Sequence, residues 1–139
     1  MHDTKDTRWK LRFEHYKKAY VSLLKSDEAL KSEPDNDFIK DSLIQRYEYT
    51  IELAWKTMKD YLEEQGFIDV SSPKKVIRKA FAEGLIEDAP GWMAALNGQN
   101  ITSHAYDETK ANAIVKDISE HYTLIFRDLF EQMNREKDA

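Results

Sequence analysis

Seven polar side chains, each of a different kind, lie within nine consecutive positions close to residue 100, and such a mixture can bind a ligand. The stretch runs from Gln99 to Asp107. Amide, hydroxyl, imidazole and carboxylate groups placed between two helices can converge on one molecule, and the first turn of the next helix adds unpaired N–H groups that favour phosphate. The alternative is an interhelical turn with Asp107 as N-cap and a locally hydrogen-bonded His104. The candidate binding residues of this stretch are Gln99, Asn100, Ser103, His104, Tyr106 and Asp107.

A second group of charged residues lies among the apolar residues of the preceding long helix. It comprises Arg46, Glu48, Glu52 and Lys56. Glu52 precedes Lys56 by four residues, which is the favourable order for an ion pair on a helix. We therefore name Arg46 and Lys56 as candidate contacts to a phosphate-bearing ligand. The alternative is a solvated helix face whose ion pairs contribute little to stability.

A dense basic cluster follows in a short predicted helix. Lys74, Lys75, Arg78 and Lys79 share one side of that helix at their spacing. Such a face can meet an acidic partner or a phosphate backbone, although it is more often simply solvated.

The residues that other kinds of site require do not occur. The chain has no Cys, which excludes disulfides and thiolate metal sites. His104 and Asp107 supply at most two metal ligands, and no HExxH motif or glycine-rich phosphate loop is present. Ser103 and His104 are sequence neighbours, which is unsuitable for a catalytic triad. We therefore expect no metal or cofactor in this chain.

The composition predicts a single domain with one apolar core and a heavily solvated surface. The 139 residues are 41% apolar and 34% charged, with a net charge of −5. The acidic balance argues against broad binding to nucleic acid, without excluding a small basic cleft. A polar N-terminus, the absence of Cys and the absence of a long apolar run predict a cytoplasmic protein without a membrane span.

The elements that must position the candidate residues are all predicted helices. Apolar residues recur at steps of three and four, and few Gly or Pro interrupt them. This pattern predicts an all-α, up-and-down four-helix-type bundle with one or two extra short helices, forming a single domain over 1–139 with its core at about 8–135. The expected helices cover residues 9–32, 37–65, 73–84, 89–98 and 107–135.

Local signals set the expected helix ends. Asp37 and Ser72 are expected N-caps, Pro73 a first helical residue, and Gly66 the residue just past a C-terminus. Gly98 is expected to end or bend the fourth helix. The wide apolar face of the last helix predicts burial on more than one side, including against a second subunit.

Two segments together resemble a known family. Residues 46–62, with the sequence Glu-Leu-Ala-Trp-Lys at their centre, resemble the second helix of the nucleotidyltransferase substrate-binding proteins. The matching downstream positions are Trp92, Leu96, Asn100 and the run Ser103-His104-Ala105-Tyr106-Asp107-Glu108, and the basic helix starting at Ser72-Pro73 also fits. The resemblance extends from about Trp9 to Met133.

The resemblance implies a HEPN-like helical partner of a minimal nucleotidyltransferase. It also implies a homodimer that assembles with two copies of the enzyme into a heterotetramer, with Mg²⁺ held on the enzyme. Many pairs of this kind are toxin–antitoxin modules, in which the helical protein is a ribonuclease.

The ribonuclease members carry an Arg, four to six further residues and a His. Here His104 occupies the histidine position of this motif. Four residues separate it from Gln99, which stands at the position of the Arg, and the neutral Gln side chain cannot replace a guanidinium. In a dimer Arg46 or Arg78 could supply that charge. We therefore expect a non-catalytic substrate-binding subunit of a two-component minimal nucleotidyltransferase system, such as the partner half of a toxin–antitoxin pair, with a nucleotide or RNA as a candidate ligand. The alternatives are a HEPN-type endoribonuclease with His104 as the catalytic residue, and a helical dimerisation module without a ligand.

Overall fold

The computed structural model describes residues 4–102 and 107–139, and the side chains of residues 8–99 and 107–139. Every regular element in this part of the chain is a helix. The bounds are α1 (Thr4–Ser32), α2 (Asp37–Glu64), α3 (Pro73–Ala82), α4 (Ala89–Thr102), α5 (Glu108–Asp117), the π-helix η1 (Ile118–Tyr122) and α6 (Thr123–Asp138). The last three follow one another directly and form one long helix with a π turn inside it.

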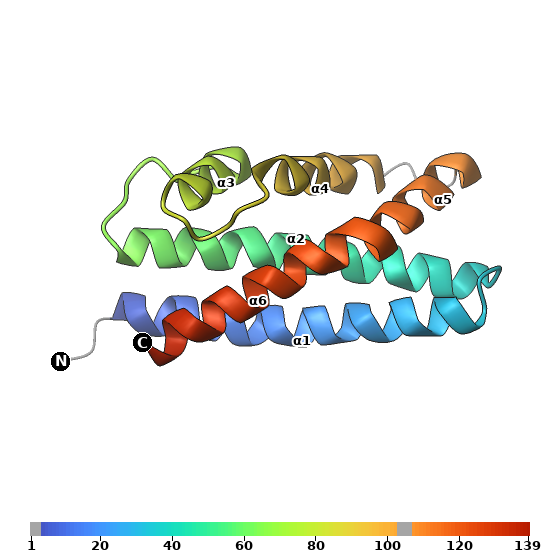
Figure 1. The fold of residues 1–139 in the computed structure, drawn as a ribbon, viewed down its shortest axis with the longest axis horizontal. Helices are drawn as coiled ribbons and strands as arrows, with labels where there is room; N and C mark the ends of the chain where they lie inside the picture. The colour runs from blue at the N-terminus through green and yellow to red at the C-terminus, as the bar shows by residue number, and fades with distance from the viewer. Residues whose placement is uncertain (1–3, 103–106) are drawn as a thin grey trace.

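The long helices form an up-and-down bundle (Figure 1). α1 and α2 pack against each other as an antiparallel pair, and α3 and α4 both pack on α2. The last helix runs back across the pair, and α6 contacts both α1 and α2. The predicted all-α bundle of three long and two short helices is therefore confirmed. None of the helices described combines the length and apolar composition needed to cross a bilayer.

Capping residues begin and end the helices close to the predicted positions. Asn36, and not Asp37, is the N-cap of α2, because its side chain accepts the hydrogen bond from the amide three residues later while Asp37 is already helical. Ser72 caps α3 and is followed by Pro73, as predicted. Gly66 follows α2 with a φ of 94°, the left-handed conformation expected of a residue just past a helix end.

Gly98 does not end α4, which continues to Thr102, so the predicted helix end at this residue is wrong. The residue instead permits a close approach between helices. A Cβ atom at position 98 would lie 2.8 Å from both Tyr47 Oη and Ile114 Cδ1. Gln99 is consequently helical, and the polar stretch that begins with it starts inside a helix and not in a turn.

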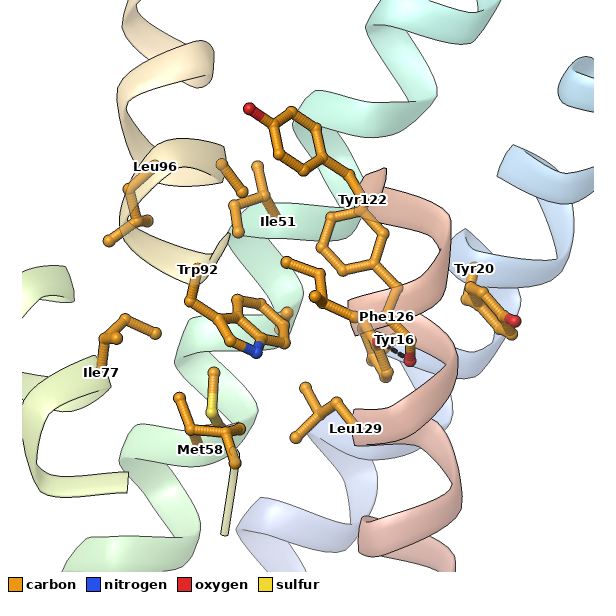
Figure 2. Close-up of a cluster of buried hydrophobic side chains, with 14 of the residues drawn as sticks. Tyr16, Tyr20, Ile51, Met58, Ile77, Trp92, Leu96, Tyr122, Phe126 and Leu129 are labelled. Carbon is orange, nitrogen blue, oxygen red and sulfur yellow. Dashed lines mark hydrogen bonds between the residues drawn. The ribbon is translucent and has the colours of Figure 1, made fainter. Parts of the chain in front are cut away.

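Aromatic rings from four helices fill the centre of the bundle (Figure 2). Trp92 of α4 packs on Phe126 of α6 with ring centroids 5.6 Å apart, and Tyr47 of α2 stacks on Tyr122 of η1 at 5.5 Å. The Tyr16 hydroxyl of α1 donates a hydrogen bond of 2.6 Å to the carbonyl of Phe126. Burial raises the pKa of Tyr16 well above its ordinary value, so this phenol is neutral.

The apolar face of the last helix is covered by the chain itself. Its residues at core spacing are all buried: Ile114, Ile118, Tyr122, Ile125, Phe126, Leu129 and Met133. Val115 and Phe130 pack against the same core, while Leu124 is about half exposed. The width of this face is therefore explained by contacts to α1, α2 and α4, and it does not by itself require a second subunit.

An ion-pair network joins the start of α1 to the end of α2. The Asp60 side chain is only 4% exposed, and its Oδ2 accepts a hydrogen bond of 3.1 Å from Arg12 Nε. Arg8 lies 3.8 Å from the other Asp60 oxygen and 3.3 Å from Glu63. A buried carboxylate needs such partners, so this network fixes the register of α1 against α2.

Candidate functional site at the end of helix α4

A polar cluster forms where the last turns of α4 meet α2. Gln99 Nε2 donates a hydrogen bond of 3.1 Å to Glu52 Oε2, and Lys56 Nζ lies 2.9 Å from Glu52 Oε1. Trp55 Nε1 donates a further hydrogen bond of 3.3 Å to Glu52 Oε2. We call Glu52, Trp55, Lys56 and Gln99 the Glu52 cluster. All four side chains are half-buried, so the cluster is open to solvent on one side.

Electrostatics keep the centre of the Glu52 cluster ionised. Burial alone would raise the pKa of Glu52, but the hydrogen bonds from Lys56, Gln99 and Trp55 together outweigh it and hold this pKa below its ordinary value. The Lys56 ammonium lies 5.9 Å from the Trp55 ring centroid, within the range of a cation–π contact. With one carboxylate and one ammonium, the cluster is formally neutral and rich in hydrogen-bonding groups.

The close packing of α4 on α2 brings Gln99 to Glu52. Tyr47 of α2 donates a hydrogen bond to the Ala95 carbonyl of α4, and Gly98 leaves room for the Tyr47 hydroxyl. Burial raises the pKa of Tyr47, which therefore stays neutral and remains a donor. Gln99 follows Gly98 directly, so its amide is held over the α2 surface.

The structure separates the other predicted contacts. Arg46 points to α1, where its Nη1 donates a hydrogen bond of 2.8 Å to the Ser22 carbonyl. Asp107 is the N-cap of α5, as the capping alternative expected, and its Oδ1 accepts hydrogen bonds from the amides of Thr109 and Lys110 at 3.0 and 3.3 Å. Of the predicted binding residues, the structure thus brings together Lys56 and Gln99.

Four predicted residues lie outside the described side chains. They are Asn100, Ser103, His104 and Tyr106. Their roles stay predictions from the sequence, and of these His104 carries the chemical argument because only it can transfer a proton near neutral pH.

The basic face of α3 is partly occupied by local partners. Lys75 Nζ lies 2.9 Å from Asp69 Oδ1, and Lys79 Nζ lies 5.1 Å from the Phe67 ring centroid. Lys74 and Arg78 are exposed. This cluster fits the solvated-face interpretation better than a built binding site.

Sequence reasoning missed the central role of Glu52 and the participation of Trp55. The Glu52–Lys56 pair is visible from its spacing of four residues, and Trp55 lies three residues from Glu52 on the same helix. The hydrogen bond from Gln99 spans 47 positions of sequence, so no local pattern could reveal it.

Comparisons with known proteins place the chain in a family. A family profile described as "Nucleotidyltransferase substrate binding protein like" matches residues 11–135. A curated relative from Haemophilus influenzae, named probable ribonuclease HepT, is 36% identical over 90 residues, which cover 59% of this chain and 62% of the relative. The chain thus spans less than two thirds of that relative's length.

Two solved structures share the fold. One is a Haemophilus influenzae protein described as having the fold of a substrate binding domain of a nucleotidyltransferase, with a TM-score of 0.80, 28% identity, and coverage of 88% of this chain and 98% of that one. The other is a protein from Thermus thermophilus, with a TM-score of 0.63, 30% identity, and coverage of 84% and 99%. Because the profile matches almost the whole length, this chain belongs to the nucleotidyltransferase substrate-binding protein family, a HEPN-like family of helical proteins.

Proposed function

We propose that this chain is the helical subunit of a two-component system whose other subunit is a nucleotidyltransferase. We further propose that it acts on RNA and cleaves it, with His104 as the proton-transfer residue. Membership of the family supports the partner, and similarity to a protein named probable ribonuclease supports the reaction. The match to that relative spans 62% of its length, so the activity is carried over here as a proposal.

The position of Lys56 is the observation that carries the proposal. RNA cleavage needs a proton-transfer group near the 2′-hydroxyl and a cation on the phosphate oxygens. Gln99 stands where the family resemblance expects Arg, and Lys56 binds the opposite oxygen of the same Glu52 carboxylate. The Lys56 ammonium therefore lies close to Gln99, with the Glu52 carboxylate between them. Lysine is a point charge without the guanidinium fork, so we expect slower cleavage than an Arg would support.

Cleavage of defined RNA by the purified chain tests this proposal. We expect His104→Ala to lower the rate by about 100-fold or more, as is typical for loss of a proton-transfer group. Lys56→Met should lower it by about 10-fold, because it removes the neighbouring cation. Lys59→Met is the matched control, since Lys59 forms the same four-residue ion pair with Glu63 one turn away, at 3.1 Å.

The outcome in cells should agree. Expression without the partner should slow growth in a His104-dependent way, and co-expression with a partner nucleotidyltransferase should restore it. RNA left intact by the unaltered chain, together with normal growth, would contradict the ribonuclease proposal.

A second candidate function is a non-catalytic substrate-binding subunit, and one observation favours it. Lys56 is already paired with Glu52, so the Glu52 cluster has no net charge to offer a phosphate. Such a neutral, amide-bearing cluster is suited to hydrogen bonds with a nucleobase or with a partner protein. Calorimetry with nucleotides and co-purification with the nucleotidyltransferase test it. Binding to the partner without any RNA cleavage would favour this candidate over the first.

A further inference from the structure

A basic groove lies along α1, on the side where Arg46 of α2 reaches it. It has a volume of about 480 Å³ and is lined by Glu14, Lys17, Lys18, Val21, Ser22, Lys25 and Arg46. Apart from Arg46, these residues belong to one stripe of α1, because they recur at steps of three and four. Arg46 reaches across from α2 to the Ser22 carbonyl and forms the other wall. None of the residues of the Glu52 cluster lines this groove.

The charge of α1 is opposite to that of the whole chain. Residues 8–25 contain six Lys or Arg and one Glu, a net charge of +5, whereas the chain carries −5. The rest of the chain therefore carries −10. Three of these α1 cations, Lys17, Lys18 and Lys25, line the groove, and Arg46 joins them from α2 only in the folded chain.

Two cations of the groove have no ion-pair partner among the described residues. Lys18 and Lys25 are exposed, and no carboxylate in the described ranges lies within ion-pair distance of either. Lys17 is paired with Glu14 at 3.0 Å. Glu14 also pairs with Lys137 at 3.3 Å, and these two ammonium groups lower its pKa. The one acid of the groove is thus already neutralised.

Arg46 adds directional donors to the groove. Its guanidinium is half-buried and held in place by the bond from Nη1 to Ser22. A guanidinium carries five N–H donors, so this bond leaves others able to form the paired contacts that suit phosphate oxygens. Val21, which is 47% exposed, supplies an apolar patch in the same groove. Fixed donors, exposed ammonium groups and an apolar side chain together match a sugar–phosphate chain better than a flat acidic protein surface.

We propose that this groove binds the phosphate backbone of single-stranded RNA at a site separate from the Glu52 cluster. The choice of RNA as the polymer rests on the proposed function, but the groove itself does not depend on cleavage. It holds the strand, and the chemistry takes place elsewhere on the molecule.

Binding of a fluorescein-labelled oligouridylate, followed by fluorescence anisotropy over a series of KCl concentrations, tests the proposal. Every variant carries His104→Ala, so that the RNA stays intact. Lys18→Gln with Lys25→Gln should weaken binding by about 10- to 30-fold at about 0.1 M salt and reduce the slope of log K against log salt by about 1 to 2, because two fewer phosphates are contacted. Arg46→Lys should weaken binding with an almost unchanged slope, because it keeps the charge but loses the fork.

The matched control is Lys74→Gln with Arg78→Gln on α3, which changes the net charge by the same amount at exposed positions. We expect it to change affinity by about twofold or less, because charges beyond a Debye length are screened. Equal losses of RNA affinity in the two double variants would overturn the proposal, because the loss would then depend only on the net charge of the chain. Absence of RNA binding, or equally tight binding of labelled polyglutamate, would also overturn it.

The two proposals fail in distinguishable ways. A chain that cleaves RNA but is indifferent to the α1 lysines overturns only the groove. A chain that binds through α1 but never cleaves overturns only the ribonuclease function. Unchanged circular dichroism and melting curves of the lysine variants, which alter exposed positions only, confirm that folding is not the cause of any loss.

Discussion

Glu52 accepts hydrogen bonds from three side chains, and two of its donors come from its own helix. The third donor, Gln99, comes from α4, so the carboxylate links two helices at the candidate site. Its negative charge also orients the Lys56 ammonium and the Trp55 indole. A change at Glu52 is therefore expected to alter several groups together.

The pKa of Glu52 gives the first prediction. Because its donors hold this pKa below the ordinary value of 4.5, the cluster stabilises the fold fully at pH values above 4.5 and loses that contribution as the pH falls through the lowered pKa. Lys56→Met or Gln99→Leu should raise the pKa, and an NMR titration of the Glu52 carboxyl carbon measures it. Lys59→Met is the control, and an unshifted value in all three variants would contradict the hydrogen-bonding description.

Asp60 gives the second prediction. Asp60→Ala should lower the free energy of unfolding by about 2 to 3 kcal/mol, because it removes a buried carboxylate that pairs with both Arg12 and Arg8. Asp128→Ala is the control: Asp128 pairs with Arg127 at 3.1 Å but is 66% exposed, so its loss should cost less than about 0.5 kcal/mol. Urea denaturation measures both, and similar losses would show that burial does not matter here.

The sequence predicts single residues well where the cause is local. Ser72, Pro73 and Gly66 have the predicted roles at helix ends because capping depends on a few neighbouring residues. Gly98 and Gln99 could not be placed correctly because their environment comes from α2, about 50 residues earlier. Local patterns carry no information on such a contact.

At the level of elements, η1 explains the unusual spacing of the last helix. Ile114, Ile118, Tyr122 and Phe126 are each four residues apart and all buried. A four-residue step slightly exceeds the 3.6 residues of an α-turn, so repeated steps drift around an ordinary helix. The wider π turn over Ile118–Tyr122 absorbs this drift and keeps the face on the core. The sequence predicts one continuous helix here and does not specify where its turn widens.

The π turn gives the third prediction. Deleting the exposed Glu120 should convert η1 into α-helix while α5 and α6 keep their buried faces, because a π turn is one extra residue in an α-helix. Deleting the exposed Asp128 from α6 should instead rotate the last turns by about 100° and expose Met133. Melting temperatures should fall much less for the first deletion, and the reverse order would contradict this description of η1.

At the level of the whole molecule, the oligomeric state is the open prediction. The sequence predicts a dimer face on the last helix, but most of the apolar residues of this helix are buried within the chain. The family resemblance still predicts a homodimer. Light scattering at micromolar concentration should return twice the 16.3 kDa of one chain. A mass equal to one chain over that concentration range would overturn the prediction.

The bundle as a whole is the most predictable feature, because apolar periodicity fixes the number of helices and short connections fix their order. The predicted all-α architecture is matched along nearly the full chain by a solved relative. The site is less predictable, since its groups come from α2 and α4 and meet only through tertiary packing. The basic groove likewise forms only after folding, because Arg46 joins the α1 lysines from a second helix.

The missing methyl group at Gly98 makes the aromatic core an internal reporter of the site. Tyr47 touches the place where that methyl would be, is hydrogen-bonded to Ala95, and stacks on Tyr122. A ligand that displaces the α4 backbone at Gln99 would change the contact between Gly98 and this ring. The signal of the buried tyrosine pair, in near-ultraviolet circular dichroism or ring NMR, would then record occupancy of the site without any label attached to it.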